Sequence, residues 1–380
     1  MFSESLIRLK EKNLLREIKN RNSPQGTRIV IDGKEYINFS SNNYLGLANH
    51  PHVIESSRKA LERFGFGSGA SRLLCGGSIL HSELEKRTAK FKGTESALIF
   101  NSGYSANTGI IPAIADEGDV IFSDELNHAS IVDGCRLSRA KKVIYRHKGT
   151  KNLSELIEKE TAKRKIIITD SIFSMDGDIS PLKELYDICL TLNVFLYIDD
   201  AHGTGVLGNG KGALAHFGIK PEPWIIQMGT FSKALGSFGA FAAGSKDAIG
   251  WILNTARSFI FSTALPSCAA AASIAALEVI EKEPELLNKL WSNREQAVHG
   301  ITKLGYDIMG SETPIIPVRT GTVEEALQIS QHLMKNGIFA PAIRPPSVKE
   351  PRIRIAVTSA HTAEDIERLI KALDSATVKQ

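Results

Sequence analysis

The sequence predicts an α/β protein whose large domain is built on a mainly parallel seven-stranded sheet, with a small C-terminal α+β domain. Short runs of β-branched residues alternate with amphipathic stretches through the middle of the chain, which is typical of strand-helix-strand units around a parallel sheet. The chain has 380 residues, of which 42% are hydrophobic and 23% charged. That length is sufficient for a large core and a second, smaller one.

The N-terminal segment, residues 1–46, precedes the large domain. Glu and Lys alternate with Leu and Ile at helical spacing within Met1–Asn22, which predicts a helix. Asp32 and Gly33 predict a short hairpin, and Asn38–Gly46 follows as a loop. The segment lacks the apolar stretch and the small-residue cleavage site of a secretory signal.

The large domain is expected to span residues 47–283. The seven predicted strands are Ala97–Phe100, Val120–Ser123, Lys142–Tyr145, Lys165–Thr169, Val194–Ile198, Trp224–Met228 and Ala240–Ala243. The clearest predicted helices are Ile79–Phe91, Ser154–Lys163, Pro181–Thr191 and Asp247–Arg257. Their charged outer faces are typical of helices that flank a sheet.

The small domain, residues 284–380, has a different pattern. A charged helix is followed by a strand at Pro314–Val318, a helix near Glu324–Lys335, a strand near Arg352–Val357 and a closing helix from Thr362. Thr362 and Asp365 resemble a capping box, which marks the start of that last helix.

Composition excludes several classes of protein. The net charge is only +4, and basic residues alternate with acidic ones, so we expect no nucleic-acid partner. The four cysteines form no C-x-x-C pair, and we expect them to be buried free thiols. The longest apolar run, Ala264–Ile280, is interrupted by polar residues and predicts a buried helix instead of a membrane span. The expected location is the cytoplasm.

A carboxylate and an amine follow two of the predicted strands. Asp199 comes directly after Val194–Ile198, and Lys233 comes shortly after Trp224–Met228. Ligands of doubly wound sheets bind at the carboxyl ends of the strands, so both side chains are expected at one edge. Pyridoxal 5'-phosphate (PLP) needs both, because its protonated ring nitrogen requires a fixed carboxylate and its aldehyde requires an amine for a Schiff base. The pair therefore predicts a PLP site.

Two further strand ends carry groups that suit the same cofactor. After the strand that ends at Phe100, the chain turns through Gly103 into a predicted helix, whose N–H groups and dipole favour a phosphate. His128 follows the strand Val120–Ser123 and is able to stack its imidazole on a pyridine ring. Both residues are therefore assigned to the predicted PLP site.

A metallohydrolase would use part of the same constellation differently. Asp199, Asp200 and His202 together could bind a metal ion. Their spacing matches no established metal motif, and Lys233 would then have no role. We therefore expect no metal site.

Three strings together resemble the α-oxoamine synthases: Asn38–Leu47 (NFSSNNYLGL), Asp199–Gly205 (DDAHGTG) and Gly229–Lys233 (GTFSK). The resemblance covers nearly the whole chain. It implies the aspartate-aminotransferase fold (fold type I), PLP as cofactor, and a homodimer whose subunits share the active sites. Members of this family condense an amino acid with an acyl thioester and release carbon dioxide.

The resemblance also implies a role for individual side chains. Lys233 would carry the cofactor, Asp199 would pair with its ring nitrogen, and these two with His128 would be the catalytic residues. His202 would bond the phenolic oxygen. The other residues implied at the cofactor are Gly103, Tyr104, Ser174, Thr230 and, from the other subunit, Ser262 or Thr263.

Within the family, Ala342–Val348 (AIRPPSV) and Leu15-Arg16 resemble the members that join L-alanine to a pimeloyl thioester in biotin biosynthesis. The substrate-binding residues that this implies are Arg16, Asn42, Ser347 and Arg354, with Arg354 at the substrate carboxylate. Glycine C-acetyltransferase and other members that use glycine or serine are alternatives, and the acyl carrier is either coenzyme A or a carrier protein.

Two readings outside this family stay open at the level of sequence. A PLP-dependent aminotransferase or lyase would share Lys233 and Asp199, but it would not depend on a thioester. A non-catalytic relative acting as a regulatory partner is disfavoured, because Lys233, Asp199, His202 and His128 are all intact.

Overall fold

The structure, a computed structural model, describes residues 2–376, and the chain divides into two compact units. The larger unit comprises residues 50–173 and 179–287. The smaller unit takes the described residues up to Asn49, residues 174–178, and those from Asn288 onward. The smaller unit therefore combines residues near both ends of the chain with a short segment from its middle, residues 174–178.

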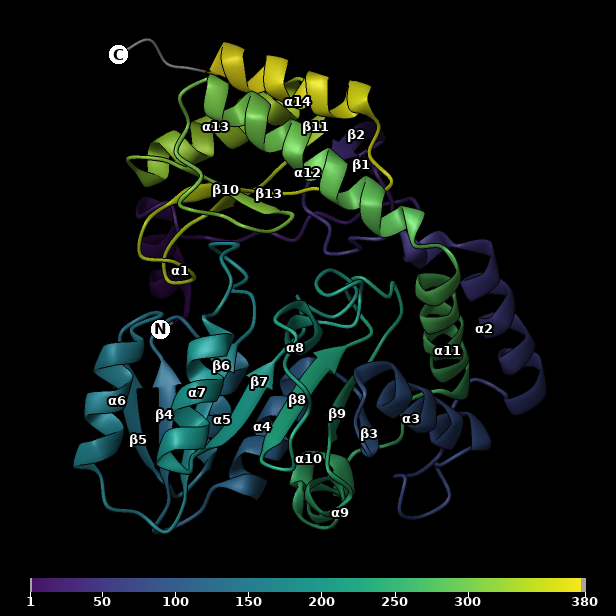
Figure 1. Ribbon diagram of the computed structural model, residues 1–380. Helices are drawn as coiled ribbons and strands as arrows, with labels where there is room; N and C mark the ends of the chain where they lie inside the picture. Colours follow the sequence, from purple (N-terminus) through teal and green to yellow (C-terminus); the bar gives the residue numbers. More distant parts are fainter. Residues whose placement is uncertain (1, 377–380) are drawn as a thin grey trace. The chain divides into compact units, whose positions relative to one another are not determined.

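A seven-stranded sheet with the order β3-β9-β8-β7-β6-β4-β5 forms the centre of the larger unit (Figure 1). Its strands are β3 (Ser96–Phe100), β4 (Val120–Asp124), β5 (Lys141–Tyr145), β6 (Lys165–Asp170), β7 (Phe195–Asp199), β8 (Ile225–Thr230) and β9 (Ala240–Gly244). β9 pairs antiparallel with β8 and β3, and the other pairs are parallel. The mainly parallel seven-stranded sheet predicted from the sequence is confirmed.

Helices cover this sheet on both faces, with α4 and α5 on one side and α6 and α7 on the other (Figure 1). The helices of the larger unit are α2 (Pro51–Phe64), α3 (Ile79–Lys92), α4 (Gly103–Ile114), α5 (Ala129–Leu137), α6 (Thr150–Lys159), α7 (Leu182–Leu192), α8 (Ala213–His216), α9 (Lys246–Thr255), α10 (Arg257–Ile260) and α11 (Ser267–Lys282). Strands buried on both faces need apolar residues at successive positions, which explains the continuous apolar runs of β6 to β8.

One predicted helix was misplaced by a turn. The sequence suggested Ser154–Lys163, whereas α6 begins at Thr150, directly after Gly149, and ends at Lys159. The Ser154 hydroxyl bonds to the carbonyl of Thr150 inside the helix instead of marking its start. The apolar run that suggested a buried helix does form α11, and no helix among the described residues is long and apolar enough to cross a membrane. Cys135 and Cys189 are buried as expected, but Cys75 is exposed.

The smaller unit contains two three-stranded sheets. The first has the order β1-β2-β11, from β1 (Arg28–Ile31), β2 (Lys34–Asn38) and β11 (Ile338–Phe339); the second has the order β10-β13-β12, from β10 (Ile315–Arg319), β13 (Arg352–Ala356) and β12 (Ala342–Ile343). The β1-β2 hairpin turns at Asp32 and Gly33, which both have positive φ angles (49° and 76°). This is the geometry that an Asp-Gly pair favours in a two-residue turn.

The helices of this unit are α1 (Phe2–Glu11), the short 3-10 helix η1 (Leu47–Asn49), α12 (Glu285–Lys303), α13 (Val323–Lys335) and α14 (Ala363–Ala376). At the start of α14 the Thr362 hydroxyl accepts from the Asp365 N–H, and the Asp365 carboxylate accepts from the Thr362 N–H, so the predicted capping box is present. β11 and β12 escaped prediction because two-residue strands have no detectable period.

Candidate active site

The carboxyl ends of four parallel strands meet along one edge of the large sheet, where β4, β6, β7 and β8 end at Asp124, Asp170, Asp199 and Thr230. This is the edge at which ligands bind in doubly wound sheets. The structure therefore places the predicted strand-end residues of the larger unit on a common border.

Asp199 is the last residue of β7 and is only 4% exposed. Its Oδ2 accepts a hydrogen bond from Asn107 Nδ2 at 2.7 Å, and its Oδ1 accepts one from the backbone N–H of Ala201 at 3.0 Å. Both of these donors are neutral groups. A buried carboxylate held by neutral donors retains a charge that a cationic ligand is suited to balance.

The carboxylate of Asp200, the next residue, has a cationic partner. Its carboxylate forms a buried ion pair with Lys92, with Nζ and Oδ2 2.7 Å apart and side-chain exposures of 0% and 1%. The Ser171 hydroxyl donates to Asp200 Oδ1 (2.7 Å), and the Thr204 hydroxyl donates to Oδ2 (3.0 Å). Asp200 is therefore not available as a metal ligand beside Asp199. The described part of the chain contains no group of three or more His, Cys, Asp or Glu residues arranged to hold a metal.

His128 lies at the start of α5, where its Nδ1 accepts a hydrogen bond from the backbone N–H of Ser130 (3.2 Å). Desolvation lowers the pKa of His128, with the Asp199 charge opposing this shift and the Lys233 charge adding to it. His128, Asp199 and Lys233 are thus close enough to influence one another electrostatically. His128 as a whole residue is exposed, as a ligand-stacking ring must be.

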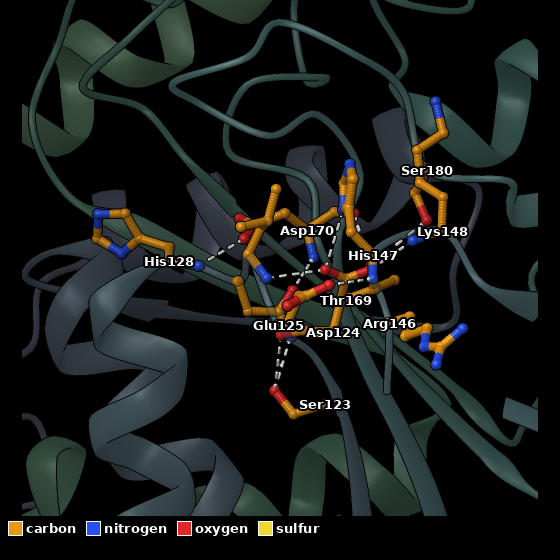
Figure 2. A network of polar contacts seen from close by, with 12 residues as sticks. Ser123, Asp124, Glu125, His128, Arg146, His147, Lys148, Thr169, Asp170 and Ser180 are labelled. Carbon is orange, nitrogen blue, oxygen red and sulfur yellow. Dashed lines mark hydrogen bonds and ion pairs between the residues drawn. The ribbon is translucent and has the colours of Figure 1, made fainter. Parts of the chain in front are cut away.

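Asp170 holds the backbone of His128 in place (Figure 2). The His128 N–H donates to Asp170 Oδ2 at 2.7 Å, and the Asp170 N–H donates to Asn127 Oδ1 at 2.9 Å. Burial and the neighbouring charge of Asp199, its partner across β6 and β7, raise the pKa of Asp170 well above its ordinary value. Burial and the Asp199 charge thus both oppose ionisation of Asp170.

Figure 2 also shows how the loop after β5 is fixed to the end of β4. Asp124 Oδ1 lies 3.0 Å from His147 Nδ1, and Asp124 Oδ2 accepts from the backbone N–H of Lys148 at 3.0 Å. The His147 ring meets the edge of Phe173 with centroids 4.4 Å apart. These contacts stiffen the strand end from which His128 follows.

The predicted phosphate-binding turn leads directly into α4. Ser102 caps the helix by accepting the Ser105 N–H, and Gly103 is the first helical residue. Tyr104 is half exposed, and its hydroxyl donates to Asp133. Asn101 Nδ2 donates to the carbonyl of Thr263 at 2.7 Å, so Thr263, and with it Ser262, lies beside this turn in the same chain.

The remaining predicted cofactor residues of the larger unit lie in the loops after β7 and β8. His202 is 6% exposed, three residues beyond Asp199. Lys233 is partly buried in the loop after β8. The Thr230 hydroxyl donates to the carbonyl of Gly239 (2.7 Å) and accepts from the Ser232 N–H (3.1 Å), so it also shapes this loop.

Three predicted residues meet within the smaller unit. Arg354 is 8% exposed; its Nε donates to the carbonyl of Ser174 (2.6 Å), and its terminal nitrogen donates to Asn42 Oδ1 (3.1 Å). The sequence suggested that Ser174 holds the cofactor; in the structure its backbone belongs to the smaller unit and orients Arg354. Arg354 has no carboxylate partner among the described residues.

Arg16 and Ser347, two of the predicted substrate-binding residues, also lie together. A terminal nitrogen of Arg16 donates to the Ser347 hydroxyl at 2.9 Å, and Arg344 donates to the carbonyl of Leu15 at 2.7 Å. These contacts hold the segment after α1 beside a cavity of about 490 Å³ within the smaller unit, lined by Arg16, Met334 and others. Arg16 and Ser347 are both exposed.

Three residues of the site were missed in the sequence. Asp170 follows a predicted strand just as Asp199 does, so the strand-end criterion applied to Asp199 would also have found it. Asn107 is a polar residue inside the apolar part of α4, which is a weaker signal. Lys92 resembles the exposed lysines of α3, and nothing in the sequence distinguishes it.

A family model described as aminotransferase class I and II matches residues 34–373 of this chain. Among curated proteins, the 8-amino-7-oxononanoate synthase of Geobacter metallireducens is 49% identical over 97% of this chain and 96% of its own length. The protein of the same name from Thermoanaerobacter pseudethanolicus is 46% identical over 98% of this chain and 95% of its own.

Solved structures show the same relationship. A serine palmitoyltransferase from S. paucimobilis with a bound PLP-myriocin aldimine matches with a TM-score of 0.94 and 28% identity, over 99% of this chain and 96% of that one. An 8-amino-7-oxononanoate synthase from Francisella tularensis matches with a TM-score of 0.78 and 27% identity, over 90% of this chain and 97% of that one.

Proposed function

The chain belongs to the class I and II aminotransferase family and, within it, to the α-oxoamine synthases, and from this premise we propose that it is an acyltransferase of biotin biosynthesis. It condenses L-alanine with a pimeloyl thioester to give 8-amino-7-oxononanoate, the free thiol and carbon dioxide. The observation that carries this assignment is the 46–49% identity, over nearly the whole chain, to relatives named for that product. Family members that use glycine or serine are not favoured.

The side chains of the larger unit fit PLP as a cofactor. Asp199 supplies a buried carboxylate that neutral donors hold, which suits a protonated pyridine nitrogen. The turn at Gly103 offers the N-terminal N–H groups of α4 to a phosphate, and Lys233 offers an amine to the aldehyde. His202 and Thr230 complete the assigned set. When bound, PLP supplies an electron sink for the negative charge left on the α-carbon of the amino acid.

Three residues carry the proton and charge movements in this proposal. The Lys233 amine takes the α-proton of alanine as a general base. Asp199 keeps the ring nitrogen protonated. The imidazole of His128 stabilises the negative charge that develops on the thioester oxygen during attack.

The smaller unit supplies the substrate-binding groups. Arg354 is oriented by neutral groups of Ser174, Asn42 and Tyr44, so its charge is left for the carboxylate of alanine. Arg16 and Ser347 are assigned to the pimeloyl chain, whose far end carries a second carboxylate that suits Arg16.

We assign the working form to a homodimer in the cytoplasm, with Ser262 or Thr263 contributed to the phosphate of the partner's site. The homodimer is typical of the family. Four free cysteines, including the exposed Cys75, suit a reducing compartment. Either coenzyme A or a carrier protein is compatible with the assigned residues as the acyl carrier.

The experiment that tests this function measures free thiol released by the PLP-loaded protein. Alanine, glycine and serine are each paired with pimeloyl, acetyl, succinyl and palmitoyl coenzyme A. We expect release to be strongest with alanine and pimeloyl coenzyme A, and the Lys233→Ala variant to give none. A clear preference for glycine with a short acyl group would refute the substrate assignment while leaving the family in place.

A further inference from the structure

Asp199 and His128 are joined by two buried side chains to which the proposed chemistry gives no role. Asn107 belongs to α4 and Ser130 to α5, and they are 0% and 1% exposed. Asn107 Nδ2 lies 2.7 Å from Asp199 Oδ2 and 2.8 Å from Ser130 Oγ. Ser130 Oγ lies 2.7 Å from His128 Nδ1. A continuous chain of hydrogen bonds therefore runs from the carboxylate to the imidazole.

The neighbours of Asn107 fix the direction of its amide. A carboxylate that carries the negative charge only accepts hydrogen bonds, so the amide nitrogen must face Asp199. On the other side, Asn107 Oδ1 lies 2.6 Å from the hydroxyl of Tyr197. Burial raises the pKa of Tyr197 well above its ordinary value, so this hydroxyl keeps its proton and donates. Both amide hydrogens of Asn107 therefore point to Asp199 and Ser130.

The direction at His128 follows from Ser130. Its hydroxyl oxygen accepts from Asn107, and among residues 2–376 the only acceptor for its hydroxyl hydrogen is His128 Nδ1. The backbone N–H of Ser130 also donates to His128 Nδ1, at 3.2 Å. A ring nitrogen that accepts hydrogen bonds carries no hydrogen, so the hydrogen of the neutral ring is on Nε2.

We propose that Asn107 and Ser130 are positioning residues that hold His128 in the Nε2–H tautomer and couple its imidazole to Asp199. The inference rests on the proposed function, in which His128 meets a developing negative charge. An Nε2–H group stabilises such a charge by donating to it, whereas the other tautomer would present a lone pair at the same place. The Nε2–H tautomer is thus the one that the reaction requires.

Nitrogen NMR of histidine-labelled protein tests the tautomer directly. The ¹⁵N shifts of the two ring nitrogens distinguish the Nε2–H from the Nδ1–H form, and the His128→Gln variant identifies the His128 signals. In the PLP-loaded wild type we expect the Nε2–H pattern. In Ser130→Ala, which loses the hydroxyl but keeps the backbone N–H, we expect the His128 shifts to move toward those of a mixture of tautomers.

Kinetics test whether the tautomer matters. For Ser130→Ala we expect kcat to fall roughly 10–50-fold while KM for alanine stays within about 2-fold, since the substrate-binding residues are untouched. For Asn107→Leu we expect the same change at His128 and, because Asp199 loses a donor, roughly 10-fold weaker PLP binding. The double variant should fall no further in kcat than Asn107→Leu alone, because both changes break one chain.

Ser138→Ala is the matched control. Ser138 is also buried, at the other end of α5, where its hydroxyl donates to the carbonyl of Ala115 at 2.7 Å. We expect this variant to keep the wild-type kcat and the wild-type His128 signals. The inference fails if Ser130→Ala leaves the His128 shifts unchanged, or if Ser138→Ala lowers kcat as much as Ser130→Ala. The NMR result does not depend on the substrate, so an error in the proposed reaction would leave it intact.

Discussion

The larger and the smaller unit each contain two neighbouring charged residues that are held in different ways. In the larger unit, Asp200 is paired with the buried Lys92, whereas Asp199 accepts hydrogen bonds from two neutral donors, the Asn107 amide and the Ala201 N–H. In the smaller unit, Arg352 is paired with Asp176 at 2.6 Å, whereas Arg354 hydrogen-bonds to neutral groups of Ser174, Asn42 and Tyr44.

This difference separates charges that stabilise a unit from charges that are kept for a ligand. A buried charge with an ionic partner is already neutralised, and it can fix a loop. A buried charge with neutral partners is oriented but uncompensated, so it favours a ligand of opposite charge. Each unit thus carries one residue of each kind: Asp199 and Asp200 lie at the end of β7, and Arg352 and Arg354 lie within β13. Variants of the four residues should therefore fall into two classes.

The largest effect is expected at Asp199. Asp199→Ala should lower kcat/KM by several orders of magnitude, at least about 10³-fold, because the ring nitrogen would lose its carboxylate. The change should leave the free energy of unfolding of the apoprotein almost unaltered or even raised, since an uncompensated buried charge is removed. Turnover assays and urea titration of the apoprotein measure the two quantities. A large loss of stability would place Asp199 in the same class as Asp200 and break the comparison.

The opposite result is expected at Lys92. Lys92→Met should lower the free energy of unfolding by about 3–5 kcal/mol, because it leaves Asp200 buried without its partner. Lys90→Met, at an exposed position of the same helix, should change it by less than about 0.5 kcal/mol. Urea titration of PLP-free protein gives both values. Equal stability of the two variants would contradict the structural role of Lys92.

A pH effect of intermediate size is expected in the smaller unit. Burial lowers the pKa of His361 to about 4, whereas an unfolded histidine titrates near 6.5. The unfolded chain therefore binds a proton between these values that the folded chain does not. The free energy of unfolding should fall as the pH falls from about 6.5 to 4, by about 3 kcal/mol in total.

His361→Asn checks that effect. His361 Nδ1 accepts from the Thr358 N–H at 3.0 Å and Nε2 lies 3.2 Å from the carbonyl of Asn38, and the Oδ1 atom of an asparagine is able to replace the first of these bonds without titrating. Unfolding by urea at pH 4.5, 5.5 and 7 should show a shallower pH dependence in the variant. An unchanged slope would mean that the loss of stability in acid has its origin elsewhere.

The smallest effect is expected at Arg354. Arg354→Lys keeps the charge but loses the planar fork, so KM for alanine should rise roughly 10–30-fold, which corresponds to about 1.4–2 kcal/mol. The free energy of unfolding should change little. Initial-rate measurements with varied alanine give KM, and Arg352→Lys serves as the contrasting variant, which should mainly lower stability. A rise in KM that is larger for Arg352→Lys would reverse the assignment of the two arginines.

The sequence predicted the strands of the large sheet because most of them are short apolar runs, and several are followed closely by a polar residue. The same regularity located Asp199, His128 and Lys233. The partners of these residues could not be found in that way. Lys92 contacts Asp200 and Asn107 contacts Asp199 only after helices α3 and α4 have packed on the sheet. The periodic pattern of apolar residues within a helix does not indicate which of its residues will contact a given strand end.

The hairpin of β1 and β2 is synthesised long before β11, the strand with which β2 pairs. β11 pairs in parallel with β2, with Ile338 opposite Ile37, so the ribosome adds about 300 residues between the two strands. At a typical pace of about 5–20 residues per second, the open edge of β2 stays uncovered for roughly 15–60 s during synthesis. An unpaired edge is a template for association with other nascent chains. The brevity of the hairpin, four and five residues in its two strands, limits that exposure.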